Sequence, residues 1–409
     1  MLPLLYTLYE WQKVGFLPTH IVAQSTKNVT GLLGQKNPFI DWLYASSSLL
    51  SRSTMSFKKP DFNITSIEGV KVEEKIIIDK TFGNLLHFEK IYDEEQKEQR
   101  PCVLVVAPMS GHFSTLVRDT IETLLQDMDV FVTDWKDVKH ISLEKGKFSL
   151  NMYISYIIEF IEFLRKYDSL HVMAICQPAV PVLGAVSLLS ENANQFSPDS
   201  MILMGGPIDT RINPGKVNLF SNEHDENFIE SLMVSMVPAQ YEGRGRRVLP
   251  GFTMLSGFMA LNPDRHQEAL KKFYQHLVVG DMESAEKHEI FYNEYRSVMD
   301  LDAAYFLDTY KAVFRDYSLP NGTFAYGDYV ANPKSIKNTA LLTIEGELDD
   351  ISPVGQTKAA HDLCIHIPAH KKHHHLQLGV GHYGIFNGRR WRTEIYPVIK
   401  RFIYEKGKK

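Results

Sequence analysis

The stretch LHVMAICQPAVPVLGAVSLLS, residues 170–190, decides the predicted fold. Its first part, residues 170–176, is a continuous apolar run, which is typical of a strand buried on both faces of a sheet. A helix is predicted directly after it, over residues 179–190. Cys176 therefore lies at the carboxyl end of a buried strand and just before a helix. This position lifts its side chain above the sheet edge, where the N–H groups of a helix N-terminus face whatever it attacks.

The same alternation of apolar strand and helix occurs on both sides of this stretch. Further buried strands are predicted over residues 102–108, 129–135, 200–206 and 338–347, with a short one at 374–378. Helices are predicted over residues 114–127, 150–166, 353–363 and 390–405. Such alternation indicates a mostly parallel, doubly wound sheet. The segments VKVEEKIIID (70–79) and NLLHFEKIY (84–92) are predicted to pair as a hairpin.

Two regions lie outside this alternation. Residues 4–57 read as amphipathic helices. Their apolar face contains Trp11, Phe16, Leu17, Phe39, Trp42 and Leu43. Residues 207–337 interrupt the pattern with helices at 264–278 and 282–316, as a cap over an active site does. The predicted organisation is an N-terminal helical extension (1–60), an α/β core (61–206), a helical cap insertion (207–337) and the rest of the core (338–409). The fold class is α/β, specifically the α/β-hydrolase fold.

The charge of the chain argues against a nucleic-acid partner. The 409 residues carry a net charge of −5, and the pI is about 6.4. Arg244, Arg246 and Arg247 form a small basic group, which we interpret as solvated loop charges rather than a phosphate site.

The chain reads as a reduced, cytoplasmic protein. Three cysteines in a chain of this length do not make a disulfide framework. The opening MLPLLYTLYEWQK has no basic segment before its apolar residues, so it does not resemble a signal peptide. No apolar run reaches the ~18 residues that a membrane span needs.

Cys176 by itself is better interpreted as an inert buried thiol. Ala174 and Pro178 occupy the two positions where a usual nucleophile elbow has glycines. Two later segments favour a nucleophile instead. GELDDISP (346–353) places Asp349 on the loop after the seventh core strand, and VGHYGIFNG (380–388) places His382 after the eighth. Nucleophile, acid and histidine follow each other in the order that an α/β-hydrolase requires.

This set predicts a triad in which His382 takes the Cys176 proton and Asp349 orients the imidazole. The rival acids are Asp350, next to Asp349, and Asp209, after the sixth strand.

The neighbouring histidines, His373, His374 and His375, are interpreted as surface residues and not as a metal site. Alternate residues of a strand point to opposite faces, so the three side chains do not converge on one ion. No cofactor and no metal are predicted.

Acyl transfer also needs two backbone N–H groups to hold the oxyanion. We expect one from Gln177 and the other from Met109, with Ser110 as the second choice for the latter.

Long motifs spread over nearly the whole chain resemble the intracellular polyhydroxyalkanoate, or polyhydroxybutyrate, depolymerases. They are LYEWQ, APMSGHFSTLVRDT, VTDWKDV, ICQPAVP, MGGPID, LPGFTMLSGFMALNP, GELDDIS and VGHYGIFNGRRWR. The resemblance implies a bacterial, cytoplasmic enzyme associated with polymer granules. It implies Cys176 as nucleophile, Asp349 as acid and His382 as base. It further implies attack on an ester of poly(3-hydroxybutyrate), a thioester acyl-enzyme, and short 3-hydroxyacid products, with water or coenzyme A as the final acceptor.

Two other functions are compatible with parts of the sequence. One is a polyhydroxyalkanoate synthase-like acyltransferase, although CQPAVP lacks the glycines expected around a synthase nucleophile. The other is a catalytically silent granule-binding protein, which has no reason to carry all three triad residues. Apolar residues of the cap are expected to form its own core; the alternative is contact with the polymer. They are Met233, Met236, Phe252, Met254, Leu255, Phe258 and Met259.

Overall fold

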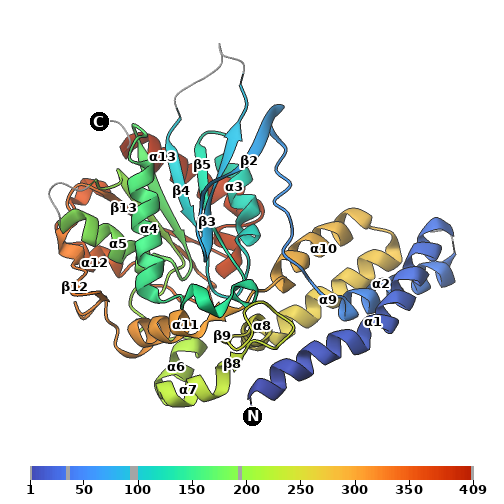
Figure 1. Ribbon diagram of the computed structural model, residues 1–409. Coiled ribbons are helices and arrows are strands. Elements are labelled where there is room, and N and C mark those ends of the chain that lie inside the picture. The colour runs from blue at the N-terminus through green and yellow to red at the C-terminus, as the bar shows by residue number, and fades with distance from the viewer. Residues whose placement is uncertain (1, 34–36, 93–99, 192–195, 407–409) are drawn as a thin grey trace.

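A large mixed sheet forms the centre of the molecule. The computed structural model describes residues 2–33, 37–92, 100–191 and 196–406. Over these residues, the central sheet contains nine strands in the order β1-β2-β3-β5-β4-β6-β7-β13-β14 (Figure 1). Their bounds are β1 Ser66–Ile67, β2 Val70–Asp79, β3 Gly83–Lys90, β4 Cys102–Val106, β5 Asp129–Trp135, β6 Leu170–Ile175, β7 Ser200–Met204, β13 Ala340–Gly346 and β14 Lys372–Gln377.

The strands run mainly in one direction. The six strands from β5 to β14 in this order are parallel, whereas β3 is antiparallel to both of its neighbours, β2 and β5. This arrangement confirms the mostly parallel, doubly wound sheet and the pairing of the two hairpin segments as β2 and β3.

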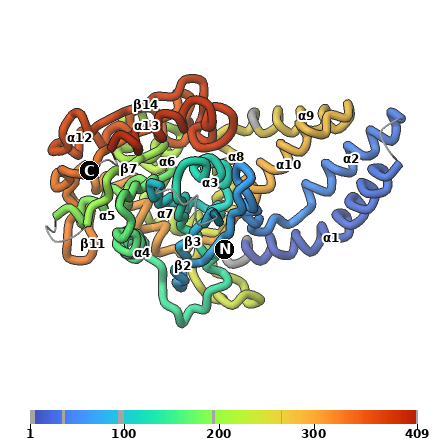
Figure 2. The backbone as a smooth tube through the Cα atoms, turned by 90° about the horizontal axis from the view of Figure 1, so that it is seen from above, coloured from blue at the N-terminus to red at the C-terminus, as the bar shows by residue number. Residues whose placement is uncertain are grey.

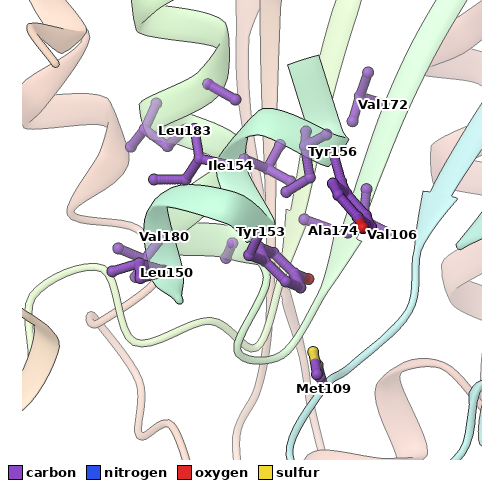
Figure 3. Packing of buried hydrophobic residues seen from close by; sticks show 14 of the residues in the cluster. Val106, Met109, Leu150, Tyr153, Ile154, Tyr156, Val172, Ala174, Val180 and Leu183 are labelled. Atoms are coloured by element: carbon purple, nitrogen blue, oxygen red, sulfur yellow. The ribbon is translucent and has the colours of Figure 1, made fainter. Parts of the chain in front are cut away.

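Apolar side chains of successive strand residues enter two different cores, one on each face of the sheet. In β4, Leu104 joins the core beneath α4 (Leu150–Leu164) and α5 (Ala179–Glu191), which Figure 3 shows. Its neighbours Val103 and Val105 join the core beneath α3 (Arg118–Leu124) and α13 (Tyr396–Lys406). Burial on both faces explains why the strands are apolar throughout.

The segment between β7 and β13 is mainly helical. Its helices are α6 Lys216–Glu223, α7 Glu226–Met233, α8 Gly251–Leu261, α9 Pro263–Val279, α10 Met282–Arg296 and α11 Ala303–Tyr310. Short strands accompany them: β8 Ser235–Met236, β9 Arg247–Leu249, β10 Leu301–Asp302, β11 Ala325–Tyr326 and β12 Tyr329–Val330. Of the seven apolar cap residues considered above, Met236 is exposed and the other six are half-buried. The predicted boundaries at residues 60, 206 and 337 stay predictions.

Two predicted helices differ from the structure. The helix predicted over 282–316 ends at Arg296, because the next residues are extended. Met299 there donates its N–H to the Gly111 carbonyl at 2.7 Å, and Leu301 pairs with Leu249 in β9. The helix predicted over 353–363 shrinks to α12, Ala360–Leu363.

Arg246 corrects the interpretation of the basic group as solvated loop charges. Its side chain is only 1% exposed and forms an ion pair of 2.8 Å with the buried Asp302. It also donates to the carbonyls of Gly146 and Ser142, at 2.6 and 2.8 Å. The charge is thus buried and compensated, and it ties a loop of the core to the segment between β7 and β13.

The N-terminal helices are α1 (Leu2–Leu33) and α2 (Pro38–Thr54), as predicted for residues 4–57. They pack on each other and, through α2, on α9, and the four helices α1, α2, α9 and α10 extend away from the sheet (Figures 1 and 2). Most of the predicted apolar face is not covered, since Trp11 is 70% and Phe39 65% exposed. Near the start of α1, Tyr6 donates its hydroxyl to the buried Asp300. No helix in the described part of the chain is long and apolar enough to cross a membrane.

Candidate active site

Cys176 occupies a sharp turn between β6 and α5. Its backbone φ is +68°, in the left-handed region that non-glycine residues rarely adopt. Its N–H bonds to the Met204 carbonyl of β7 at 2.7 Å, and its own carbonyl accepts from the Ala179 N–H at 3.1 Å. Such a conformation costs about 1–3 kcal/mol and persists where the surroundings impose it, often at functional sites. The turn presents a half-buried thiol at the carboxyl edge of the sheet.

Two glycines after β7 provide the space for this turn. A side chain at Gly206 would overlap the Cβ atom of Ala179 and lie 2.9 Å from the Cys176 carbonyl oxygen. A side chain at Gly205, whose φ is +55°, would lie 3.1 Å from the His382 ring. The MGG segment is thus required for the neighbouring elements to approach Cys176.

The loops after β13 and β14 bring Asp349 and His382 together. The imidazole Nδ1 of His382 lies 2.7 Å from Oδ2 of Asp349. The other carboxylate oxygen accepts from the N–H groups of Ile351 and Ser352, at 2.9 and 2.8 Å. Both side chains are buried, with 3% exposure for His382 and none for Asp349. The carboxylate is therefore held firmly and oriented toward the ring.

The electrostatics of His382 favour its protonated form. Burial alone lowers the pKa of a histidine, but the Asp349 carboxylate and the Cys176 sulfur act in the opposite sense. Together they raise the pKa of His382 well above its ordinary value, and the Cys176 side chain is hydrogen-bonded to the ring. The three side chains thus form a continuous chain from sulfur to imidazole to carboxylate.

The rival groups lie elsewhere. The carboxylate of Asp209 binds the Arg211 guanidinium, with two oxygens at 2.8 Å from its nitrogens. In the described part of the chain, the side chains of Asp209 and Asp350 make no hydrogen bond to His382. Burial raises the pKa of the other two thiols, well above normal for Cys102 and to about 12 for Cys364, so these remain protonated.

The His373–His375 run does not assemble a metal site. His373 is exposed, whereas His374 and His375 are half-buried. Among the residues that the structure describes, no group of three or more His, Cys, Asp or Glu side chains is arranged to hold a metal ion.

The two backbone groups expected to hold an oxyanion lie at the same edge of the sheet. Gln177 directly follows Cys176, and Met109 lies in the loop after β4, below the ends of the strands in Figure 3. Neither N–H donates a hydrogen bond to any residue in the described ranges. The loop that carries Met109 is anchored, because His112 bonds to the Tyr295 carbonyl at 2.9 Å. Both N–H groups are thus available to a ligand, and the backbone that carries them is held in place by other contacts.

The structure adds polar side chains that the sequence analysis missed. Tyr153 on α4 and Tyr305 on α11 are completely buried near the Cys176 sulfur. Tyr305 belongs to none of the motifs found in the sequence, and its helix falls within the longer helix predicted over residues 282–316. No spacing in the sequence connects either tyrosine to Cys176, so only the packing of α11 on α4 brings them there.

The strand order, with one antiparallel strand near an edge and a cysteine on the turn after β6, is that of the α/β-hydrolase fold. The model of the family described as PHB de-polymerase C-terminus matches residues 205–407. The matched residues, which include Asp349 and His382, are similar to that family.

Several solved structures share the course of the chain with low sequence identity. A soluble variant of monoglyceride lipase from Saccharomyces cerevisiae is 11% identical, with a TM-score of 0.48, covering 86% of this chain and 99% of the other. A 2-hydroxy-6-oxo-6-phenylhexa-2,4-dienoate hydrolase from Rhodococcus is 14% identical, with a TM-score of 0.43 and coverage of 82% and 99%. A thermophilic esterase from Thermogutta terrifontis gives the same four values. No curated protein matches the sequence significantly.

Proposed function

We propose that this protein is an intracellular depolymerase that cleaves ester bonds of poly(3-hydroxybutyrate) or related short-chain polyhydroxyalkanoates. The observation that carries the proposal is the buried His382–Asp349 pair, hydrogen-bonded to a cysteine held in a left-handed turn. The polymer is proposed as substrate because residues 205–407 match the family described as PHB de-polymerase C-terminus.

The proposed reaction begins with transfer of the Cys176 proton to His382. The thiolate attacks the ester carbonyl, and the C–O bond to the alcohol portion of the chain breaks. The imidazolium returns its proton to the departing alkoxide, which leaves as an alcohol, and a thioester remains on Cys176. Water then attacks the thioester with His382 as base, releasing the carboxylic acid and the thiol. The buried Asp349 stabilises the imidazolium in both steps.

The negative oxygen that forms in each attack needs hydrogen-bond donors. The N–H groups of Gln177 and Met109 are the proposed donors, since both are free and lie on backbone that other contacts hold in place. Removing such a donor in a related type of site costs about 10²–10³ in kcat.

The proposed location follows from the substrate. Poly(3-hydroxybutyrate) is stored as cytoplasmic granules, so the protein is proposed to act in the cytoplasm at the granule surface and on released oligomers. Coenzyme A is the alternative acceptor for the acyl group, in which case an acyl-CoA is the product.

The direct test is incubation of the purified protein with amorphous polymer granules, with and without coenzyme A. We expect 3-hydroxyacids or short oligomers from the wild type and none from Cys176→Ala. Acyl-CoA formed only in the presence of coenzyme A identifies the thiol as acceptor. A matched control is Cys364→Ala, which removes another buried thiol and should retain activity.

Polymer formed from 3-hydroxybutyryl-CoA would instead show a synthase. Full activity of Cys176→Ala on granules would contradict the proposed nucleophile.

A further inference from the structure

Several buried polar atoms beside Cys176 lack a well-formed hydrogen bond within the part of the chain that the structure describes. They are the hydroxyls of Tyr153, Tyr305 and Thr309 and both polar atoms of the Gln177 side-chain amide. The Tyr305 oxygen interacts with the side chains of Thr309 and Gln177. By distance and angle, however, none of these atoms forms a normal hydrogen bond to a residue that the structure describes. Buried polar groups are nearly always paired, because an unpaired one is costly. A cluster of them at one place therefore points to a ligand.

These groups come from three elements that meet at the nucleophile. Tyr153 extends from the first turn of α4 toward the end of the strands, on the side of the loop that carries Met109 (Figure 3). Its ring lies 5.3 Å from that of Tyr305, which belongs to α11. The Tyr305 hydroxyl lies beside the Thr309 hydroxyl and the Gln177 amide, and Gln177 directly follows Cys176.

The two phenols are rigid and permanently protonated. The ring of Tyr153 stacks on Trp135, with centroids 4.4 Å apart, and both tyrosines pack against Phe148. Burial, assisted by the nearby Cys176 sulfur, raises the pKa of both hydroxyls well above the ordinary value. Both hydroxyls therefore remain neutral donors at any working pH. Neutral hydroxyl donors that are buried away from water suit an uncharged oxygen acceptor, such as an ester carbonyl. They do not neutralise the charge of an ionised ligand.

We propose that Tyr153, Tyr305 and the Gln177 amide form a binding site for the second ester group of the polymer, the one attached at the β-carbon of the acyl unit bound to Cys176. The inference rests on the proposed function and specifies how that site selects its substrate. Each repeat of a poly(3-hydroxyalkanoate) places an oxygen two carbons from the reacting carbonyl. That oxygen and the carbonyl attached to it bring acceptors to a place where the hydroxyls of Tyr153 and Tyr305 and the NH2 group of Gln177 are available as donors. A plain alkanoyl chain leaves these donors unpaired, and sites of this kind discriminate strongly.

The test compares two activated esters that differ only in these oxygens. One is 4-nitrophenyl 3-acetoxybutanoate, which carries the second ester, and the other is 4-nitrophenyl 3-methylhexanoate, in which methylene groups replace it. For the wild type we expect kcat/KM to favour the acetoxy ester. In Tyr305→Phe, and separately in Tyr153→Phe, we expect this preference to fall about tenfold, the value of one good hydrogen bond. The ratio of the two kcat/KM values is independent of the fraction of folded enzyme, so partial misfolding of a variant does not affect it.

The matched control is Tyr310→Phe. Tyr310 lies on the same helix as Tyr305, but its hydroxyl already donates toward the carbonyls of Ser221 and His224, at 3.0 and 2.9 Å. The preference of Tyr310→Phe for the acetoxy ester should equal that of the wild type. An unchanged preference in both Tyr305→Phe and Tyr153→Phe would overturn the inference, as would a wild type that shows no preference. If only the inference fails, hydrolysis of granules by the wild type still occurs and still depends on Cys176. If the wild type does not hydrolyse granules, the proposed function itself is wrong.

Discussion

Replacing Asp349 by Asn tests the proposed mechanism with the least disturbance of shape. One carboxylate oxygen accepts from the N–H groups of Ile351 and Ser352, at 2.9 and 2.8 Å, and the other faces His382 Nδ1 at 2.7 Å. An Asn side chain keeps its single oxygen on the two N–H groups, so its NH2 group faces the ring. His382 must then accept at Nδ1 and carry its proton on Nε2, toward Cys176. In that tautomer it does not take the thiol proton.

The expected loss is large because the pair is dry. His382 is 3% exposed and the Asp349 side chain is fully covered, so water does not replace the missing carboxylate. The corresponding change in a serine protease triad lowers kcat about 10⁴-fold, which is about 5 kcal/mol of transition-state stabilisation. We expect a loss of about 10³–10⁴-fold here.

The same substitution should change how stability depends on pH. Despite its burial, His382 has a pKa raised well above normal by Asp349 and Cys176. A raised histidine pKa stabilises the folded state fully below the unfolded value of about 6.5, and this contribution is lost as the pH rises through the folded pKa. The difference in unfolding free energy between wild type and Asp349→Asn should therefore be largest below about pH 6.5 and shrink at higher pH.

The assay is hydrolysis of 4-nitrophenyl butanoate at pH 7, together with the rate of Cys176 alkylation by iodoacetamide, followed by mass spectrometry. Both rates should fall in Asp349→Asn, and the neighbouring Asp350→Asn should match the wild type. Retention of more than a tenth of the activity by Asp349→Asn, or an equal loss in Asp350→Asn, would refute the assigned acid.

Three further predictions concern the framework. Arg246→Ala should lower the free energy of unfolding by about 3–5 kcal/mol, because it leaves a buried carboxylate unpaired; thermal unfolding should show little change for the exposed Arg247→Ala. Gly206→Ala should abolish ester hydrolysis by displacing the nucleophile turn, whereas Gly257→Ala, where a Cβ meets open space within a helix, should stabilise by about 0.5–1 kcal/mol. Burial raises the pKa of Asp300 to about 7, so wild-type stability, measured by denaturant titration, should fall as the pH rises from about 4 to 7, and Asp300→Asn should remove that fall.

The core of this fold is readable from the sequence because its strands are buried on both faces. Each becomes an apolar run bounded by helices, and the chain order of Cys176, Asp349 and His382 follows from the shared sheet edge. The predictions that were wrong concern residues whose structure depends on contacts between distant segments. The helix predicted through residues 297–302 gives way because Met299 bonds to the loop after β4. Arg246 is buried because Asp302, far along the chain, neutralises it. Neither contact leaves a local pattern.

The N-terminal helices are a second case in which the sequence does not determine which side chains are buried. Their amphipathic pattern predicts helices correctly, but it does not state what covers the apolar face. Trp11 and Phe39 are mostly exposed although their pattern is the one that usually indicates burial. Local periodicity determines the type of element, and only the tertiary arrangement determines which face is covered.

The absence of glycines around Cys176 is explained by the neighbouring strand, which no pattern around Cys176 itself indicates. A nucleophile turn needs space, and the usual place to look for it is two residues before and after the nucleophile, here Ala174 and Pro178. The structure provides the space from the adjacent strand instead. Gly206 makes room for the first residue of α5 and the Cys176 carbonyl, and Gly205 leaves room for the His382 ring and the Asp349 carboxylate, 3.1 and 3.3 Å from where its side chain would begin. The MGG segment, predicted as the end of a strand, is therefore the part of the sequence that allows Cys176, His382 and Asp349 to approach one another.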